Sequence, residues 1–339
     1  MIFVTVGSLA FATKEQTMPV TIQDTLPAAE TLAQENIFFM TKERAVRQDI
    51  RPLQIALLNL MPNKSTTETQ FLRLLGNTAL QVEVTFLCTG TYTPKHTDTS
   101  YLKTFYKTFE QVKDQQFDGL IVTGAPIETL EFEEVTYWNE LVEILNWAQE
   151  NVYSSLFVCW GAQAALHHYY KIGKQKLEKK LSGVYSHTLL DPHHTLVRGF
   201  DDEFDAPHSR HTTVDLEAVK AIEELIVLGE SPEAGLYLAS SKDDRKVFIT
   251  GHCEYDLYTL DAEYQRDREA GMCPSLPYRY YPNDDSTKKP SSTWRSHAHL
   301  LFNNWLNYSV YQETPYCIGE LTASREAGPW KDHRETGRQ

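Results

Sequence analysis

Nearly continuous apolar runs recur along the first half of the chain. They occupy four segments: Leu53–Leu60, Leu80–Leu87, Phe117–Thr123 and Leu156–Val158. Runs of this kind are typical of strands that are buried on both faces of a sheet. Two helices are predicted between these runs. One follows Leu53–Leu60 and extends to about Leu75, and the other extends from about Val135 to Asn151, where the spacing of apolar residues is helical. Because strands alternate with helices, we predict a mostly parallel sheet in a three-layer α/β domain, with a flavodoxin-like strand order.

The second half of the chain continues this pattern with shorter segments. It predicts helices at about residues 256–269 and 294–310, and three further strands at Glu224–Leu228, Leu236–Ala239 and Lys246–Thr250. The segment Gly271–Pro290 is rich in proline and polar residues, which predicts a surface loop. Earlier in the chain, Ser65 and Glu68 stand three residues apart before an apolar run and predict a capping box at the start of a helix.

The two ends of the chain differ in character from its centre. Residues 1–12 form a short apolar run with no Lys or Arg before it, whereas Met18 opens a polar stretch typical of a protein start. We therefore predict that residues 1–17 are a non-structural extension, with a signal peptide as the alternative. A single domain of residues 18–316 and a polar tail of residues 317–339 would follow. No other apolar stretch approaches the ~20 residues that span a membrane.

The charge balance and the cysteines exclude several classes of partner and site. The chain carries a formal net charge of −14, so we expect no basic surface that binds a nucleic-acid backbone or an anionic membrane. Its five cysteines are odd in number and widely spaced, and no CxxC motif occurs. This pattern argues against a disulfide framework or a thiolate zinc site. It predicts free thiols in a reducing compartment, the cytoplasm.

One of these cysteines stands where a predicted strand turns into a predicted helix. Cys159 follows Leu156–Val158, and Gly161 and a helical segment to Tyr170 come next. A sharp turn of this kind lifts a nucleophile clear of the sheet. The free N–H groups at the helix start favour a thiolate and can hold an oxyanion. The alternative is a buried structural thiol, since free cysteine is among the most buried residue types.

A histidine and a glutamate follow the last predicted strand. His252 and Glu254 are two residues apart, so in extended chain their side chains point the same way. The carboxylate is then able to hold the imidazole in one tautomer, as in a catalytic triad. A surface His and Glu that happen to alternate are the alternative. Together with Cys159, the pattern predicts a cysteine nucleophile, a histidine base and an orienting carboxylate.

From Met18 to about Tyr316, the chain closely resembles the homoserine O-acyltransferases of methionine biosynthesis. The resemblance rests on the segments IRPLQIALLNLMPNKSTTETQFLRLL, QFDGLIVTGAPIETLEFEEVTYW, LFVCWGAQAAL, KLSGVY, RGFDDEFDAPHSR, FITGHCEYD and SSTWRSHAHLLFNNWLNYSVYQ. It implies the class I glutamine amidotransferase-like fold and transfer of an acyl group from acyl-CoA to L-homoserine. The family's triad falls on Cys159, His252 and Glu254. The resemblance also implies a homodimer. One departure is Cys253, where the family commonly has proline.

The resemblance further implies three substrate-binding residues. They are Lys180, Ser209 and Arg266. The guanidinium of Arg266 suits the α-carboxylate of homoserine, and the hydroxyl of Ser209 suits its amine or hydroxyl. Solvated surface charge is the alternative for Lys180 and Arg266. Lys64 lies just past a predicted strand end and is a candidate contact for the CoA or the acyl group.

Backbone N–H groups are expected to form the oxyanion hole of this enzyme. The N–H of Trp160 follows the nucleophile directly, and the Leu60–Met61 segment after the first strand is a candidate for the second donor. Neither assignment depends on the side chain at these positions.

Glu128 is the residue that the resemblance connects to the choice of acyl group. Glycine at this position resembles the succinyl-using members, and glutamate resembles the acetyl-using ones. We therefore expect acetyl-CoA as the donor and O-acetyl-L-homoserine as the product. Succinyl-CoA as the donor is the first alternative, and a glutamine amidotransferase-like cysteine amidohydrolase is the second. A glutamate that faces solvent and only caps a loop is the alternative for Glu128 itself.

No metal or cofactor is predicted. Histidines and aspartates cluster between residues 187 and 211, but their spacings match no zinc pattern, and no H-E-x-x-H motif occurs. Gly124-Ala-Pro126 does not match a phosphate-binding loop, and no GxGxxG motif indicates a dinucleotide site. Acetyl-CoA would be a substrate, not a cofactor.

Overall fold

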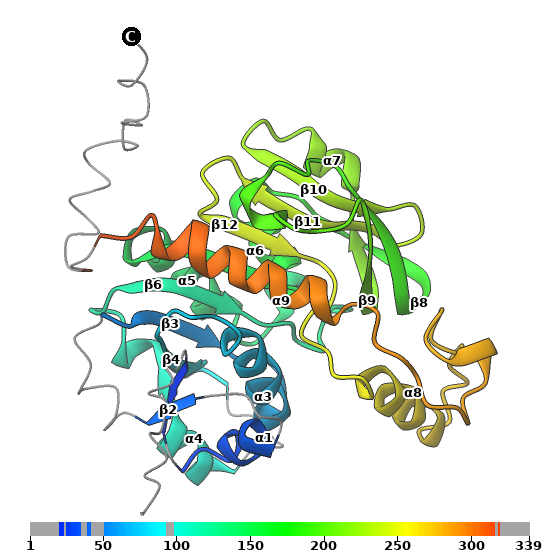
Figure 1. The fold of residues 1–339 in the computed structure, drawn as a ribbon, viewed down its shortest axis with the longest axis horizontal. Helices are drawn as coiled ribbons and strands as arrows, with labels where there is room; N and C mark the ends of the chain where they lie inside the picture. The colour runs from blue at the N-terminus through cyan, green and yellow to red at the C-terminus, as the bar shows by residue number, and fades with distance from the viewer. Residues whose placement is uncertain are drawn as a thin grey trace, which may run out of the picture.

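The computed structural model describes residues 20–23, 25–34, 39–41, 51–92, 98–315 and 318. The extension predicted at residues 1–17 lies outside these residues, as does the predicted C-terminal tail apart from residue 318. Twelve strands of the described chain form one sheet in the order β2-β1-β4-β3-β6-β7-β12-β11-β10-β8-β9, with β5 paired to β4 (Figure 1). Within the same residues, no helix is both long enough and apolar enough to cross a membrane.

Parallel pairing dominates one half of the sheet. The strands that pair in parallel are β1 (Val20–Ile22), β2 (Phe39–Thr41), β3 (Leu53–Leu58), β4 (Val82–Cys88), β5 (Tyr106–Thr108), β6 (Phe117–Val122), β7 (Val152–Val158) and β12 (Lys246–Ile249). The central five run β4-β3-β6-β7-β12 across the sheet. In order along the chain this is 2-1-3-4-5, the flavodoxin-like order that the sequence predicts.

An antiparallel extension completes the other half of the sheet. It consists of β8 (Lys174–Leu189), β9 (Glu203–Val214), β10 (Leu225–Ser231) and β11 (Gly235–Ser241), and it joins the parallel part through the pairing of β11 with β12. The sequence did not predict β8 or β9. The first half of β8 is rich in lysine and largely exposed, so it lacks the apolar alternation of a half-buried strand.

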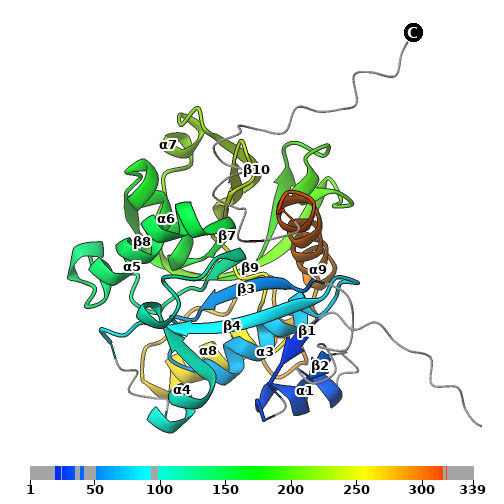
Figure 2. The same ribbon diagram turned by 90° about the vertical axis from the view of Figure 1, so that its left-hand side faces the viewer.

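Helices cover both faces of the parallel strands (Figure 2). Along β3, Ile55 and Leu57 belong to the core cluster that contains residues of α3 and α9, whereas Ala56 and Leu58 belong to the cluster that contains residues of α5 and α6. This alternation confirms the three-layer α/β prediction. The helices are α1 (Ala28–Gln34), α3 (Lys64–Leu75), α4 (Thr99–Phe105), α5 (Trp138–Asn151), α6 (Trp160–Tyr170), α7 (Leu216–Lys220), α8 (Thr259–Glu269) and α9 (Arg295–Asn304).

Several local predictions are corrected by tertiary contacts. The N-cap of α3 is Asn63, whose side chain accepts a hydrogen bond from Thr66 N, so the predicted Ser65–Glu68 capping box is wrong. The Glu68 side chain is buried and accepts hydrogen bonds from tyrosines of other elements. The predicted loop Gly271–Pro290 has no regular element beyond a short 3₁₀ turn, but it buries Tyr280 and Tyr281 in a separate small core. From Trp305 to Tyr311 the helix that begins with α9 is a π-helix.

The buried carboxylate at the start of β6 is expected to be a large contributor to stability. Asp118 is 0% exposed and accepts two hydrogen bonds from the Arg51 guanidinium, both of 2.9 Å, and one from Gln54 N. Asp118→Ala leaves that guanidinium without its carboxylate, so we expect the free energy of unfolding to fall by about 3 kcal/mol. Urea titration followed by circular dichroism measures the change.

A matched control is the exposed ion pair between Lys113 and Glu110. Because water screens this pair, Glu110→Ala should change the free energy of unfolding by less than ~0.5 kcal/mol. Similar losses for the Asp118 and Glu110 variants would contradict the assignment.

Candidate active site

Cys159 occupies a strained turn between β7 and α6. Its φ of 51° is unusual for a residue with a side chain, and its N–H donates to Ile249 O at 2.7 Å. A Cβ on Gly161 would lie 2.7 Å from Thr123 O, so the helix is able to approach β6 this closely only with glycine there. The turn has the geometry of a nucleophile elbow, as the sequence predicts.

His252 and Glu254 follow β12 and lie beside this turn. His252 Nδ1 and Glu254 Oε1 are 2.6 Å apart, and the two residues are 4% and 7% exposed. The backbone N–H of His252 donates to Pro207 O at 2.8 Å, and the imidazole ring stacks on the Tyr255 ring with 4.1 Å between centroids. These contacts fix the orientation of the imidazole, whose other side hydrogen-bonds the Cys159 thiol.

The surroundings of His252 favour its protonated form. Burial opposes a positive charge on His252, but the Cys159 thiolate and the Glu254 carboxylate outweigh it and raise the pKa of the imidazole well above its usual value. At neutral pH the imidazole is therefore protonated when Cys159 is a thiolate. A thiolate is the form of cysteine that attacks carbonyl carbon.

A buried arginine interacts electrostatically with Cys159. Arg210 is 1% exposed, and its guanidinium donates to Ala234 O and contacts His208 Nδ1. Burial lowers the pKa of Arg210 to about 10, and the Cys159 thiolate acts against this lowering. The guanidinium therefore remains charged at neutral pH and adds to the positive potential around Cys159.

Gly124, two residues after β6, leaves no room for a side chain beside Cys159 and His252. A Cβ at this position would lie 3.2 Å from Cys159 Cβ and 3.5 Å from His252 Cε1. We expect Gly124→Val to displace these two side chains and to lower kcat/KM by about 100-fold or more, since a displacement near 1 Å costs on this order. The measurement is steady-state acyl transfer.

The control for Gly124 is Gly173. A Cβ on Gly173 would meet no atom within 4 Å. Gly173→Val should therefore leave kcat/KM within about twofold of the wild type, as is usual for a surface substitution. Full activity in the Gly124 variant would show that the site accommodates a side chain there.

A pocket of about 490 Å³ opens onto Cys159 and His252. It also brings together four other residues predicted from the sequence: Glu128, Lys180, Ser209 and Arg266. Lys64 is not among the residues that line this pocket. Its side chain is buried, its amine donates to Asn59 O, and burial lowers its pKa to about 8. The Lys64 amine thus bonds to the chain directly after β3.

The N–H groups predicted for the oxyanion hole differ in their availability. Trp160 is the first residue of α6, so no carbonyl one turn back in the helix accepts its N–H. The Leu60 N–H donates to Thr123 Oγ1 at 2.8 Å, and the Met61 N–H donates to Asn59 Oδ1 at 3.1 Å. Of these three described N–H groups, those of Leu60 and Met61 are therefore already bonded within the protein, which favours Trp160 as the donor.

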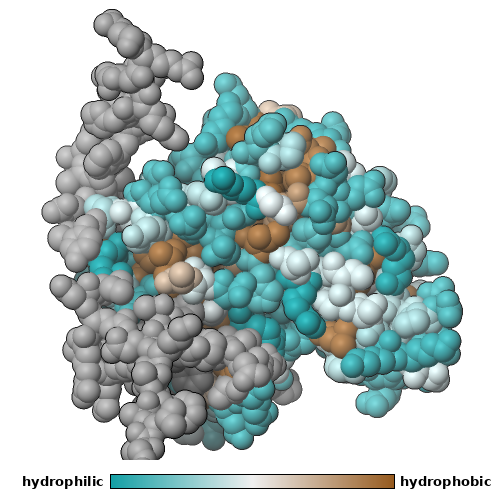
Figure 3. Space-filling model, viewed as in Figure 1, coloured by the Kyte–Doolittle hydropathy of each residue, from teal (hydrophilic) through white to brown (hydrophobic). Residues whose placement is uncertain are grey.

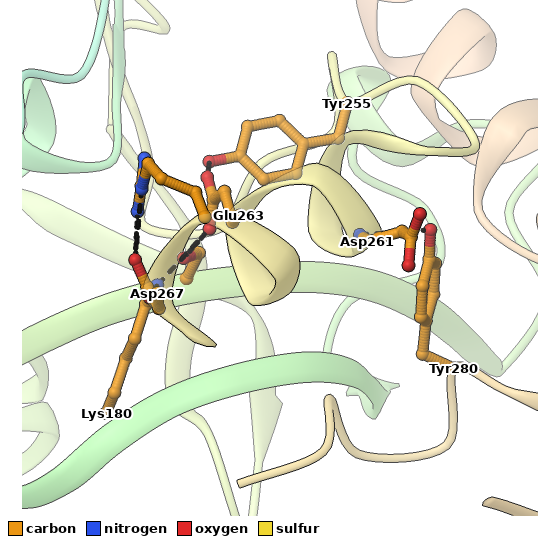
Figure 4. Close-up of polar contacts among 8 residues, drawn as sticks. Lys180, Tyr255, Asp261, Glu263, Asp267 and Tyr280 are labelled. Atoms are coloured by element: carbon orange, nitrogen blue, oxygen red, sulfur yellow. Dashed lines mark hydrogen bonds and ion pairs between the residues drawn. The ribbon is translucent and has the colours of Figure 1, made fainter. Parts of the chain in front are cut away.

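Charged side chains of α8 form a network at the mouth of the pocket (Figure 4). Glu263 accepts hydrogen bonds from Ser209 Oγ, from Lys180 Nζ at 3.4 Å and from Tyr255 Oη at 2.8 Å. Sequence reasoning missed Glu263 and Tyr255. The spacing of Glu263 and Arg266 by three residues, which places both on one face of a helix, was a signal that could have found Glu263.

A second carboxylate completes this network. Asp267 accepts from Lys180 Nζ at 3.1 Å and from Arg266 Nη2 at 2.7 Å, and Figure 4 shows Lys180 reaching from β8 towards α8. Burial of Asp267 opposes its ionisation, but the hydrogen bonds from Arg266 and Lys180 outweigh burial and lower its pKa. The side chain of Arg266 is still 66% exposed, so it remains accessible to a ligand.

Comparison with known proteins places the chain among enzymes that acylate homoserine. It is 54% identical to a homoserine O-acetyltransferase of Acetivibrio thermocellus over 304 residues, which cover 90% of this chain and 100% of that protein. It is 56% identical to a homoserine O-acetyltransferase of Brevibacillus brevis, over 88% of this chain and 98% of the relative. A homoserine O-succinyltransferase of Aliivibrio fischeri is 55% identical, over 88% of this chain and 96% of the relative.

A solved structure and a sequence family also match the chain. The crystal structure of SMU.1228c matches with a TM-score of 0.50 and 15% identity, over 75% of this chain and 99% of that chain, which shows a shared fold alone. The sequence model of the family described as homoserine O-succinyltransferase matches residues 19–316. The chain belongs to the homoserine O-succinyltransferase family.

Proposed function

We propose that the protein transfers an acetyl group from acetyl-CoA to the γ-hydroxyl of L-homoserine, a step of methionine biosynthesis, through an acyl-cysteine. The observation that carries this proposal is the arrangement of Cys159, His252 and Glu254 beside a pocket that also holds Lys180, Arg266 and other polar groups. Membership of the family and the names of the relatives support the substrates. The geometry supports the covalent route.

The first half-reaction uses the thiolate–imidazolium pair. The Cys159 thiolate attacks the carbonyl carbon of the thioester, and the Trp160 N–H stabilises the oxyanion of the tetrahedral intermediate. The bond from that carbon to the sulfur of CoA then breaks. His252 gives its proton to the departing thiolate, so free CoA leaves and the imidazole becomes neutral. Because one thioester replaces another, this step is nearly balanced in free energy.

The second half-reaction transfers the acyl group from sulfur to oxygen. Neutral His252 accepts the proton of the γ-hydroxyl while that oxygen attacks the acyl carbon. The bond from the carbon to Cys159 Sγ breaks, which releases the ester and restores the thiolate beside an imidazolium. Glu254 holds the ring in the tautomer that this exchange requires. Loss of the thioester makes the second transfer favourable.

The network on α8 suits a zwitterionic amino acid. Arg266 and Lys180 supply two positive charges for the α-carboxylate, and Glu263 and Asp267 supply two negative ones, of which Glu263 is placed for the α-ammonium. A site with both signs of charge binds an amino acid, which has a carboxylate and an ammonium group on one carbon, better than it binds a simple carboxylate or a simple amine. This complementarity favours homoserine over a neutral alcohol as the acceptor.

Removal of Arg266 is expected to affect only the second half-reaction. Loss of one charge-assisted hydrogen bond to the α-carboxylate should raise KM for homoserine by about 10- to 100-fold. Release of CoA thiol in the absence of homoserine, measured with a thiol reagent, should be unchanged in Arg266→Ala. Arg268→Ala is the matched control, because Arg268 lies on the same helix and its side chain contacts Gln265 and the Tyr264 ring, neither of which lines the pocket.

If thiol release collapses in the Arg266 variant, Arg266 acts on the donor or on the fold, and the assignment to homoserine is wrong. Replacing homoserine with glutamine in the same assay tests the amidohydrolase alternative. Glutamine hydrolysis by the wild type, with no acyl transfer, would overturn the proposed function.

A further inference from the structure

A groove of about 1210 Å³ lies next to the active-site pocket. It runs between α3 on one side and the starts of α8 and α9 on the other, and Figure 3 shows the surface hollowed between the part that carries α3 and the part that carries α8. Tyr255 lines both the groove and the pocket. Just before the start of α3, Pro62 lines the pocket and the next residue, Asn63, lines the groove. The groove and the pocket therefore adjoin each other at Tyr255, whose ring stacks on His252.

The groove is lined by basic side chains from two helices. Arg73 projects from α3, and Arg295 and His299 project from α9, one helical turn apart on the same face. Arg295 is exposed and makes no ion pair or hydrogen bond with another described residue. His299 Nδ1 is buried and lacks a hydrogen-bond partner within the described structure. Burial, Arg295 and Arg73 together lower the pKa of His299, which shows that the three groups lie close together.

The acidic side chains of the groove are already occupied. Asp256 is ion-paired with Arg73, and Glu254 is bonded to His252. In addition, α9 begins at the groove, and its N-cap Trp294 provides no side-chain acceptor for the first-turn N–H groups. A helix start of this kind attracts negative charge. In a chain of net charge −14, this groove is thus a local site for anions.

The length of α3, which begins next to the pocket that holds Cys159, fits a particular kind of ligand. Arg73 follows Asn63 by ten residues of α3, which corresponds to ~15 Å along the helix axis. The extended pantetheine arm of CoA has a comparable length, and it separates the reactive thioester from the phosphates. A thioester at Cys159 would thus place the phosphates near Arg73 and Arg295.

We propose that this groove binds the phosphorylated nucleotide end of the acyl-CoA donor. The phosphates lie against Arg295, His299 and the start of α9, and the arm passes Tyr255 to reach Cys159. This inference rests on the proposed function, because it assumes an acyl-CoA donor, but it adds a binding site that the catalytic residues do not specify.

The kinetic test compares two donors that differ in their phosphates. We expect Arg295→Ala to raise KM for acetyl-CoA about tenfold or more, the loss expected for a charge-assisted hydrogen bond, with kcat within about twofold. For S-acetylpantetheine, which has the arm but no phosphate, KM should not change. Arg295→Lys should recover part of the loss. Lys288→Ala, which removes a cation outside the groove, is the matched control.

A binding measurement keeps the inference testable without turnover. Isothermal titration calorimetry with adenosine 3′,5′-bisphosphate should show binding to the wild type and binding about tenfold weaker to Arg295→Ala. No binding to the wild type, or equal binding to both proteins, would overturn the inference. An equal rise in KM for both donors would overturn it too. Absence of acyl transfer in the wild type, with bisphosphate binding intact, would instead count against the proposed function.

Discussion

Cys159→Ser is expected to lower acyl transfer by about 1000-fold or more without unfolding the protein. The site surrounds this position with His252, the start of α6 and the buried Arg210, all of which stabilise a thiolate. A serine hydroxyl has a far higher pKa than a thiol, so the same surroundings do not ionise it. The oxygen occupies less space than sulfur, so the fold should tolerate it.

Mass spectrometry of the wild type mixed with acetyl-CoA alone is the direct measurement. An adduct with the mass of one acetyl group should appear on Cys159 and should disappear when homoserine is added. Cys273→Ser is the control, because Cys273 is an exposed thiol. The covalent route is wrong if the wild type forms no adduct and the Cys159 variant retains near-normal turnover.

The features that the sequence predicts correctly are those set by neighbouring residues. Apolar runs such as Leu53–Leu58 and Phe117–Val122 form strands because they are buried on both faces, whatever surrounds them. The relation between His252 and Glu254 also follows from local spacing, since two residues in extended chain share a side. The sequence therefore predicted both the parallel sheet and the contact between His252 and Glu254.

The features that the sequence misses depend on distant contacts. Glu68 would cap its own helix if α3 were isolated, but Tyr101 and Tyr106 reach its carboxylate from elements more than thirty residues away. Leu60 would present a free N–H if Thr123 did not accept it. Likewise, Glu263 joins the active site only because α8 packs beside β8 and β9. No local pattern contains this information.

Wild-type enzyme is expected to use acetyl-CoA in preference to succinyl-CoA because of Glu128. This residue is half-buried and lines the same pocket as Cys159. Succinyl-CoA ends in a second carboxylate, which would approach the Glu128 carboxylate when the thioester meets the nucleophile. Two like charges at ~4 Å repel by about 4 kcal/mol at an effective dielectric near 20. Glutamate also fills volume that the longer acyl chain needs, whereas acetyl has neither the charge nor the length.

Because Glu128 is partly exposed, water screens part of this repulsion, and the expected preference in kcat/KM is about 100-fold instead of the full value. Glu128→Gly removes both the charge and the volume. The kcat/KM for succinyl-CoA should therefore rise by most of that factor, while the kcat/KM for acetyl-CoA should change little. Glu131→Gly, at an exposed glutamate three residues on, is the control and should alter neither donor. Steady-state kinetics with the two thioesters provide the measurement. A wild-type preference for succinyl-CoA would overturn the acetyl assignment, and a glycine variant with no gain for succinyl-CoA would show that Glu128 does not select the acyl group.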